Sequence, residues 1–321
     1  MRLNHYIGIY SNIYRWPKYW HLFRVLPTLI RRGPSACQEF IRFVRSNQFD
    51  EVSWDERDNL PSIEILLAAI EKDFWLLPYS LKLAVQNSLN PVLKITIITQ
   101  DRSLALCRDT LERIDLGVPI EVLSEDQQLK ESFRALVRDA FRDRYGWALQ
   151  QFLTVNYIIN SKNRGVLAIN ADTLILKKQA WLTESHQLLM VSSEFHPPYY
   201  EILTKLGLPC KNPKFTFVTH HMMFIPQKFQ SILMRLEIID LDDLLLKTLQ
   251  ALRDSKDKSI CVEFELYAQG LLRWFPESIK LARFGNLGIS AKENKSGQNL
   301  DILINSDNFS GYNSLSIHSW S

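Results

Sequence analysis

The tripeptide Asn170-Ala171-Asp172 interrupts an otherwise apolar run at residues 166–176, which reads VLAINADTLIL. The flanking apolar residues predict a buried strand, and helical patterns lie on either side of it. In α/β folds ligands bind at the carboxyl ends of strands, so Asp172 falls where a carboxylate could hold a metal ion. A buried Asp in a strand-end turn gives the same pattern, and the tripeptide alone leaves both interpretations open.

Two kinds of chemistry use an acidic tripeptide at such a place. Phosphatases of the haloacid-dehalogenase type carry Asp-x-Asp-x-Thr, whose first residue is the nucleophile. Asn170 stands at that position, and a carboxamide cannot form an aspartyl-phosphate, so the sequence disfavours a phosphatase. The second chemistry holds Mn²⁺ or Mg²⁺ against a diphosphate. There Asn170 is tolerated, because its carbonyl can meet a ribose hydroxyl or a metal-bound water while Asp172 supplies the anionic oxygen.

The elements around this tripeptide alternate between strand and helix, which predicts a mostly parallel sheet with right-handed crossovers. The predicted strands are 63–70, 93–99, 118–123, 166–176, 188–192, 215–218 and 314–318. The predicted helices are 76–88, 104–114, 127–145, 147–159, 229–252 and 263–274, and residues 194–200 read as a loop. The sequence therefore predicts an α/β unit at 61–321, preceded by an N-terminal extension and linker at 1–60.

Composition excludes several classes. A net charge of +3 over 321 residues implies no general affinity for nucleic acid. The four cysteines have no paired spacing, which favours reduced thiols in a cytoplasmic protein over a disulfide framework or a zinc site. No apolar run approaches the ~20 residues that span a bilayer, and the N-terminus lacks the apolar core of a signal peptide.

The first 38 residues contain six Lys or Arg and no Asp or Glu, interleaved with tyrosines and tryptophans. Cations beside interfacial aromatics suit an anionic membrane surface. A helical extension packed on the main domain, with its basic face solvated, is the other interpretation. The sequence leaves both open.

Four stretches together resemble a known family. They are Gly146-Trp147-Ala148-Leu149-Gln150-Gln151, Asn170-Ala171-Asp172-Thr173, Thr219-His220-His221-Met222 and Glu263-Phe264-Glu265-Leu266-Tyr267. In this order and spacing they resemble a bacterial family of largely uncharacterised GT-A-like nucleotide-diphospho-sugar transferases, over about four-fifths of the chain. The chain departs from the family at Asn170, usually acidic, and at Thr154, often Lys.

The resemblance implies a GT-A-type, Rossmann-like fold and a set of site residues. Asp172, Asn170 and the C-terminal His318 would hold Mn²⁺ or Mg²⁺, and one of Glu263 and Glu265 would deprotonate the acceptor. The expected donor-binding residues are Asp73, Gln150, Gln151, Asn170 and Asp172, and a simple helix N-cap is the other interpretation of Asp73. The expected acceptor-side residues are Glu194, His196, His220 and His221, with Tyr199 in the same loop; local packing is the other interpretation of the two adjacent histidines.

The function expected from these residues is a cytoplasmic glycosyltransferase. It would move a sugar from a nucleotide-diphosphate donor to a glycan or lipid-linked acceptor in cell-surface polysaccharide or lipopolysaccharide synthesis, with peripheral contact to an anionic membrane. The alternative is a non-catalytic nucleotide-sugar-binding module that partners another transferase, because Asn170 replaces a carboxylate.

Overall fold

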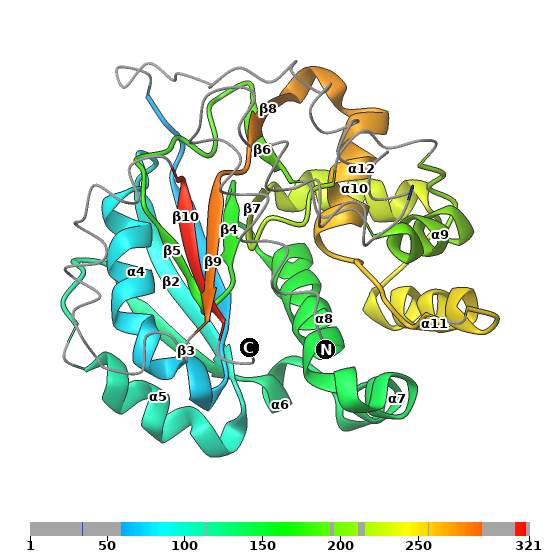
Figure 1. Cartoon of the computed structure of the whole chain (residues 1–321), viewed down its shortest axis with the longest axis horizontal. Coiled ribbons are helices and arrows are strands. Elements are labelled where there is room, and N and C mark those ends of the chain that lie inside the picture. Colours follow the sequence, from blue (N-terminus) through cyan, green and yellow to red (C-terminus); the bar gives the residue numbers. More distant parts are fainter. Residues whose placement is uncertain are drawn as a thin grey trace.

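The structure is a computed structural model that describes residues 59–112, 114–192, 196–210, 216–255, 257–290 and 312–318, together with Pro34. Its centre is a five-stranded sheet (Figure 1). The strand order is β3 (Ile120–Ser124), β2 (Val92–Thr99), β1 (Ile63–Ala68), β4 (Val166–Ile169) and β7 (His221–Phe224). All neighbours are parallel except β4 and β7. The predicted mixed α/β architecture with a mostly parallel sheet is therefore observed.

Both faces of the sheet are covered, as the continuous apolar runs of its central strands require. Ile63, Ile65 and Leu67 of β1 pack into one cluster with residues of the helices on their face, α4 (Leu77–Gln86) and α5 (Leu104–Leu111). Leu66, on the opposite face of β1, belongs to a second, larger cluster. Alternate residues of one strand thus enter two separate cores, because successive side chains point to opposite faces.

The second core is built by six helices on the other side of the sheet (Figure 1). These helices are α7 (Glu131–Phe141), α8 (Tyr145–Asn160), α9 (Pro197–Lys205), α10 (Pro226–Arg235), α11 (Leu241–Leu252) and α12 (Phe264–Trp274). Helices α10 and α12 pack closely at Gly270, where an added Cβ would lie 2.6 Å from Cγ2 of Ile232. Shorter helical segments are η2 (Glu71–Leu76), η3 (Asp101–Ser103), α6 (Glu125–Gln128), η4 (Arg142–Arg144) and η5 (Pro276–Ser278).

Two smaller sheets complete the described fold. In the first, the C-terminal strand β10 (Ser314–His318) lies between β5 (Thr173–Ile175) and β9 (Asn286–Ser290), antiparallel to the former and parallel to the latter (Figure 1). In the second, β6 (Gln187–Val191) pairs with β8 (Ile279–Arg283) in parallel. The first small sheet matters for function, because β5 follows Asp172 directly and β10 ends at His318.

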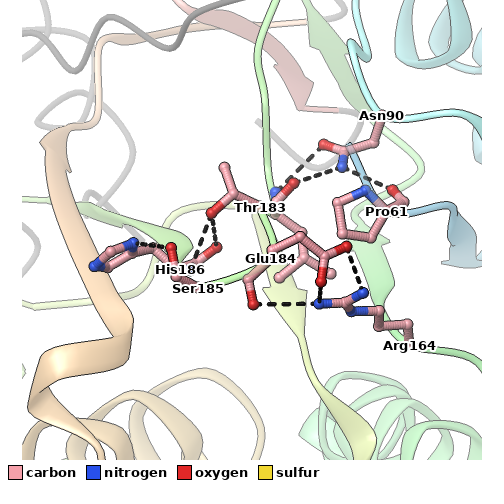
Figure 2. Close-up of polar contacts among 8 residues, drawn as sticks. Pro61, Asn90, Arg164, Thr183, Glu184, Ser185 and His186 are labelled. Atoms are coloured by element: carbon pink, nitrogen blue, oxygen red, sulfur yellow. Dashed lines mark hydrogen bonds and ion pairs between the residues drawn. The ribbon is translucent and has the colours of Figure 1, made fainter. Parts of the chain in front are cut away.

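Hydrogen bonds at the amino end of the sheet hold neighbouring segments together. Asn90 is buried, and its amide donates to the Pro61 carbonyl at 2.9 Å (Figure 2). The same amide donates to the Leu182 carbonyl at 2.7 Å, and its Oδ1 accepts from the backbone N–H of Trp181 at 2.8 Å. Beside it the Arg164 guanidinium forms two hydrogen bonds with the exposed Glu184 carboxylate (Figure 2). Arg164 therefore lies at the edge of the sheet opposite to the tripeptide.

The structure corrects several predicted boundaries. The helices expected at 127–145 and 147–159 do not separate near Gly146, which lies inside α8; the break is at Arg142, where φ is 45°. The single helix expected at 229–252 is two, α10 and α11, separated at Glu237 with φ 56°. The strand expected at 215–218 is wrong: Thr216 forms only an isolated bridge, and the strand is β7. Helical periodicity continues across such breaks, so it did not reveal them.

The N-terminal extension lies outside the described residues, apart from Pro34. Whether its basic and aromatic residues contact a membrane or pack on the main domain therefore stays a prediction. Among the helices that the structure describes, none is long and apolar enough to cross a bilayer.

Candidate functional site

The site lies at the carboxyl edge of the central sheet. Strands β1 and β4 pair with Leu66 opposite Ala168, so the segments that follow them leave from the same edge. After β4 come Asn170 and Asp172, and after β1 comes the partly buried Asp73 in η2. Asp73 is inside this short helix, whose N-cap is Ile70, and is not an N-cap itself. Asp73 and the tripeptide thus occupy the edge where open α/β sheets bind ligands.

The C-terminal strand brings His318 to Asp172. Thr173 of β5 pairs with Ser316 of β10, and the backbone N–H of Ile317 donates to the Asp172 carbonyl at 2.9 Å. This register places His318 beside Asp172, with Nδ1 3.2 Å from the carboxylate Oδ2. The two side chains are only 6% and 17% exposed, so little solvent separates them.

Asn170 is held in place from two sides. Nε2 of Gln150, on α8, donates to Oδ1 of Asn170, and Nδ2 of Asn170 lies 3.2 Å from Nδ1 of His220, which accepts from it. The backbone N–H of Asn170 also donates to the His220 carbonyl at 2.8 Å. His220 has φ 58°, a left-handed conformation that is uncommon outside glycine and concentrates at functional sites.

The local electrostatics favour an anionic Asp172 beside a neutral His220 imidazole. Burial by itself would raise the pKa of Asp172, but the hydrogen bond from His318 and the nearby His220 bring that pKa below its usual value. Burial lowers the pKa of His220 to about 4, although Asp172 acts in the opposite direction. At neutral pH the Asp172 carboxylate is therefore the one anionic oxygen donor in this group.

These donors fit a hard divalent cation whose remaining ligands come from a substrate. Asp172 and His318 are the residues that would hold such an ion, the first by a carboxylate oxygen and the second by an imidazole nitrogen. The described residues contain no group of three or more His, Cys, Asp or Glu arranged to hold a metal. A metal ion held by Asp172 and His318 would therefore take part of its shell from water or a substrate, as Mg²⁺ does at phosphate sites.

Glu263 is the N-cap residue of α12 and is partly buried. Burial raises the pKa of its carboxyl to about 7, against the opposing effect of a hydrogen bond with Thr154 of α8. A carboxyl group with such a pKa exchanges protons readily near neutral pH, which is the property that a general base needs.

Glu265 serves the fold. Its side chain is fully buried, and its Oε1 accepts from the Thr216 hydroxyl, from the Phe217 backbone N–H at 2.6 Å and from the Tyr200 hydroxyl at 3.1 Å. Its Oε2 accepts from Gln269. Four donors enclose this carboxylate, so its hydrogen bonds are made within the core.

Gln150 and Gln151 are adjacent in α8 but have different roles. Gln150 contacts Asn170, whereas the buried Gln151 donates to the Ile260 carbonyl at 3.3 Å and accepts from the Val262 N–H at 3.0 Å. Gln151 thereby fixes the segment that leads to Glu263 against α8, the helix whose Gln150 contacts Asn170. Gln151 therefore has a positioning role.

The residues predicted for the acceptor side do not lie together. His220 belongs to the Asp172 group, whereas His221 is fully buried between the rings of Trp181 and Phe284, which agrees with local packing. His196 is the N-cap residue of α9, with Nε2 3.3 Å from Asp257. Tyr199 lies in α9, so its placement in a loop is wrong, and Glu194 lies outside the described residues.

Two residues that the sequence did not single out support the site. Asn286 of β9 accepts from Ser314 at 2.8 Å and from Ser316 at 3.2 Å, which anchors the strand that carries His318. The Ser80 hydroxyl donates to the Thr173 carbonyl at 2.7 Å, which anchors the strand after Asp172. No spacing in the sequence marks either residue, because each acts across a long interval.

Comparisons with known proteins find distant structural similarity only. No protein-family model matches the chain, and no curated protein does either. Among solved structures, an apo crystal structure of mouse xyloside xylosyltransferase 1 is similar, with a TM-score of 0.43 and 12% identity over 79% of this chain and 97% of that one.

Proposed function

We propose that the protein is a glycosyltransferase that moves a sugar from a nucleotide-diphosphate donor to a hydroxyl group of a glycan or lipid-linked acceptor. The observation that carries the proposal is the pairing of Asp172 with His318 at the carboxyl edge of the sheet, beside the fixed amide of Asn170. A single anionic oxygen with an imidazole and an amide suits a cation that shares its shell with a diphosphate.

Asp172 and His318 would hold Mn²⁺ or Mg²⁺, and the Asn170 carbonyl would contact the ion's water or the donor ribose. The cation would supply positive charge that stabilises the departing diphosphate. To bind it, His318 must present Nδ1 without its proton, because the same nitrogen otherwise donates to Asp172. Gln150 and His220 keep the Asn170 amide oriented, so the site needs little rearrangement to bind the donor.

Glu263 would act as the base on the acceptor. Transfer requires that the attacking hydroxyl lose a proton as the bond to the sugar carbon forms and the bond to the diphosphate breaks. A carboxylate with a pKa of about 7 accepts that proton more readily than an ordinary Glu. Its place at the N-cap of α12 leaves it outside the network that encloses Glu265.

The proposal extends to the setting predicted from sequence: a cytoplasmic enzyme of cell-surface polysaccharide or lipopolysaccharide synthesis, with peripheral contact to anionic membrane. The test is a thermal-unfolding screen of nucleotide-sugars with Mn²⁺, with Mg²⁺ and with chelator. A donor at a hundred times its Kd should add about 2.7 kcal/mol of stability, and only when the metal is present. Transfer of labelled sugar from that donor should follow.

The outcomes separate the alternatives. Stabilisation by a donor without transfer to any acceptor would favour the nucleotide-sugar-binding module. Failure of every nucleotide-sugar, with and without metal, would overturn the proposed function.

A further inference from the structure

A polar cluster that includes no residue of the Asp172 group lies where α8 begins. Its members come from three parts of the chain: Arg144 and Trp147 at the start of α8, His196 at the start of α9, and Asp257 and Ser259 in the segment before α12. Arg144 and Asp257 are each 44% exposed, so ligand atoms can reach both. The proposed donor chemistry uses none of the five.

The cluster holds a donor and an acceptor in fixed positions. The guanidinium carbon of Arg144 lies 3.8 Å from the centroid of the Trp147 ring, and Nη1 of Arg144 donates to the Ser259 hydroxyl at 2.6 Å. Asp257 accepts from the Ser259 N–H at 2.8 Å and lies 3.3 Å from Nε2 of His196. Within the described residues, the remaining N–H groups of Arg144 donate to no protein atom. Ring stacking thus presents these groups in a defined plane.

The cluster is connected to both halves of the proposed site. Arg144 precedes Gln150, the residue that contacts Asn170, by six positions, so it lies about 9 Å farther along the helix axis. Helix α8 leads into β4 and packs on the sheet at the neighbouring parallel strand β1, so its first residues extend past the carboxyl edge, toward the side where open α/β sheets bind ligands. Asp257 and Ser259 begin the segment that Gln151 fixes and that ends at Glu263.

The charges of the cluster point to a neutral ligand. Arg144 and Asp257 lie 3.9 Å apart and offset each other. Burial would raise the pKa of Asp257, but the hydrogen bonds from Ser259 and the nearby His196 and Arg144 lower it overall, so the carboxylate is ionised. Burial lowers the pKa of His196, although Asp257 acts in the opposite direction. A phosphate or a uronate that approached Arg144 would also meet the Asp257 carboxylate.

We propose that Arg144 and Asp257, oriented by Trp147, His196 and Ser259, form the acceptor subsite, and that it binds a vicinal diol of a neutral saccharide. One hydroxyl of such a diol donates to the carboxylate while its neighbour accepts from the guanidinium. Both hydrogen bonds are charge-assisted and need no net charge on the ligand. This inference rests on the proposed function, because it identifies the group that Glu263 would deprotonate as part of a saccharide.

The test uses the full chain and two kinds of probe. Methyl glucoside, methyl galactoside and methyl mannoside are the neutral probes, and glucuronate and glucose 6-phosphate are the anionic ones. Binding is followed by saturation-transfer NMR and by the indole N–H resonance of Trp147. At least one neutral probe should bind with a Kd in roughly the millimolar range, about tenfold more tightly than the anionic probes.

Matched variants locate the binding. Asp257→Asn and Arg144→Lys should each weaken binding of the neutral probe about tenfold, since each removes one charge-assisted hydrogen bond. The controls are Asp254→Asn, an exposed Asp of the same segment, and Arg142→Lys, an exposed Arg of η4; both should bind as wild type. Thermal unfolding shows whether each variant is folded. If Asp257→Asn does not fold, the binding of the neutral probe to Arg144→Lys decides whether the subsite exists.

Nucleoside-diphosphate binding with Mn²⁺ is measured on the same samples. If nucleotide binding is intact but neutral saccharides do not bind, the subsite is overturned while the proposed function stands. The same holds if they bind to Asp257→Asn and Arg144→Lys as tightly as to the wild type. Tighter binding of an anionic probe would also overturn it. If Mn²⁺-dependent nucleotide binding is absent, the proposed function fails, and the saccharide results with the four variants still decide whether the subsite exists.

Discussion

His318 Nδ1 lies 3.2 Å from Oδ2 of Asp172, although 146 positions separate the two residues in the chain. The contact depends on the antiparallel pairing of β10 with β5, because a shift of one residue in that register would turn His318 to the other face. His318, at the end of the described chain, therefore joins Asp172, which lies in the turn after β4.

Asp172→Asn should abolish metal-dependent donor binding. The substitution removes the anionic oxygen while keeping the shape of the side chain, and we expect Mn²⁺-dependent nucleoside-diphosphate affinity to fall at least about 100-fold. Titration calorimetry with and without Mn²⁺ measures the loss. Asp139→Asn, an exposed Asp on α7, serves as the control. Equal affinity in Asp172→Asn and wild type would remove Asp172 from the metal site.

Asn170→Asp should strengthen metal binding. A second carboxylate in a hard-cation site is expected to raise Mn²⁺ affinity about tenfold. The new carboxylate would also face Nδ1 of His220, so the pKa of that imidazole should rise from about 4. Electron paramagnetic resonance of Mn²⁺ and NMR titration of His220 check the two effects. Sugar transfer that appears only in this variant would show that the natural chain is a binding module.

Glu263→Gln should lower kcat about 10²- to 10⁴-fold and leave donor affinity unchanged, because only the base is lost. In the wild type, activity should rise as the pH increases through about 7, where the Glu263 carboxyl loses its proton. The variant should lack this rise. A pH–rate profile that is the same in both proteins would exclude Glu263 as the base.

The same variant tests the effect of Glu263 on stability. Burial raises its folded pKa from 4.5 to about 7, so the folded protein binds the proton more tightly than the unfolded chain. The associated stability is present below pH 4.5 and is lost as the pH rises to about 7. Chemical unfolding between these pH values should show a smaller decline in Glu263→Gln than in the wild type.

Glu265→Gln should destabilise the fold. The amide would place N–H groups among the donors of Thr216, Phe217 and Tyr200, so hydrogen bonds inside the core would be lost at a cost of about 2–4 kcal/mol. Urea unfolding measures this change, and Glu201→Gln, an exposed Glu on α9, is the control. A stable Glu265→Gln protein that lost only turnover would instead give Glu265 a chemical role.

The sequence by itself determined the alternation of strands and helices and the position of Asp172. Both follow from local signals: the apolar periodicity of each segment, and one polar tripeptide that interrupts a buried strand. The helix at 264–274 and the strand at 314–318 were also predicted closely, since their patterns extend over whole elements. The ends of helices were less predictable, because the left-handed residues Arg142 and Glu237 are not types that mark a break.

The tertiary structure alone decided which of the candidate side chains meet. His220 reaches Asn170 while its neighbour His221 packs between aromatic rings, and Glu265 is enclosed by donors while Glu263 is not. In each pair the two residue types are identical and nearly adjacent, so no local pattern could separate them. Their roles depend on strand register and on partners many residues away, and those are fixed only when the long-range packing of the sheet and helices is complete.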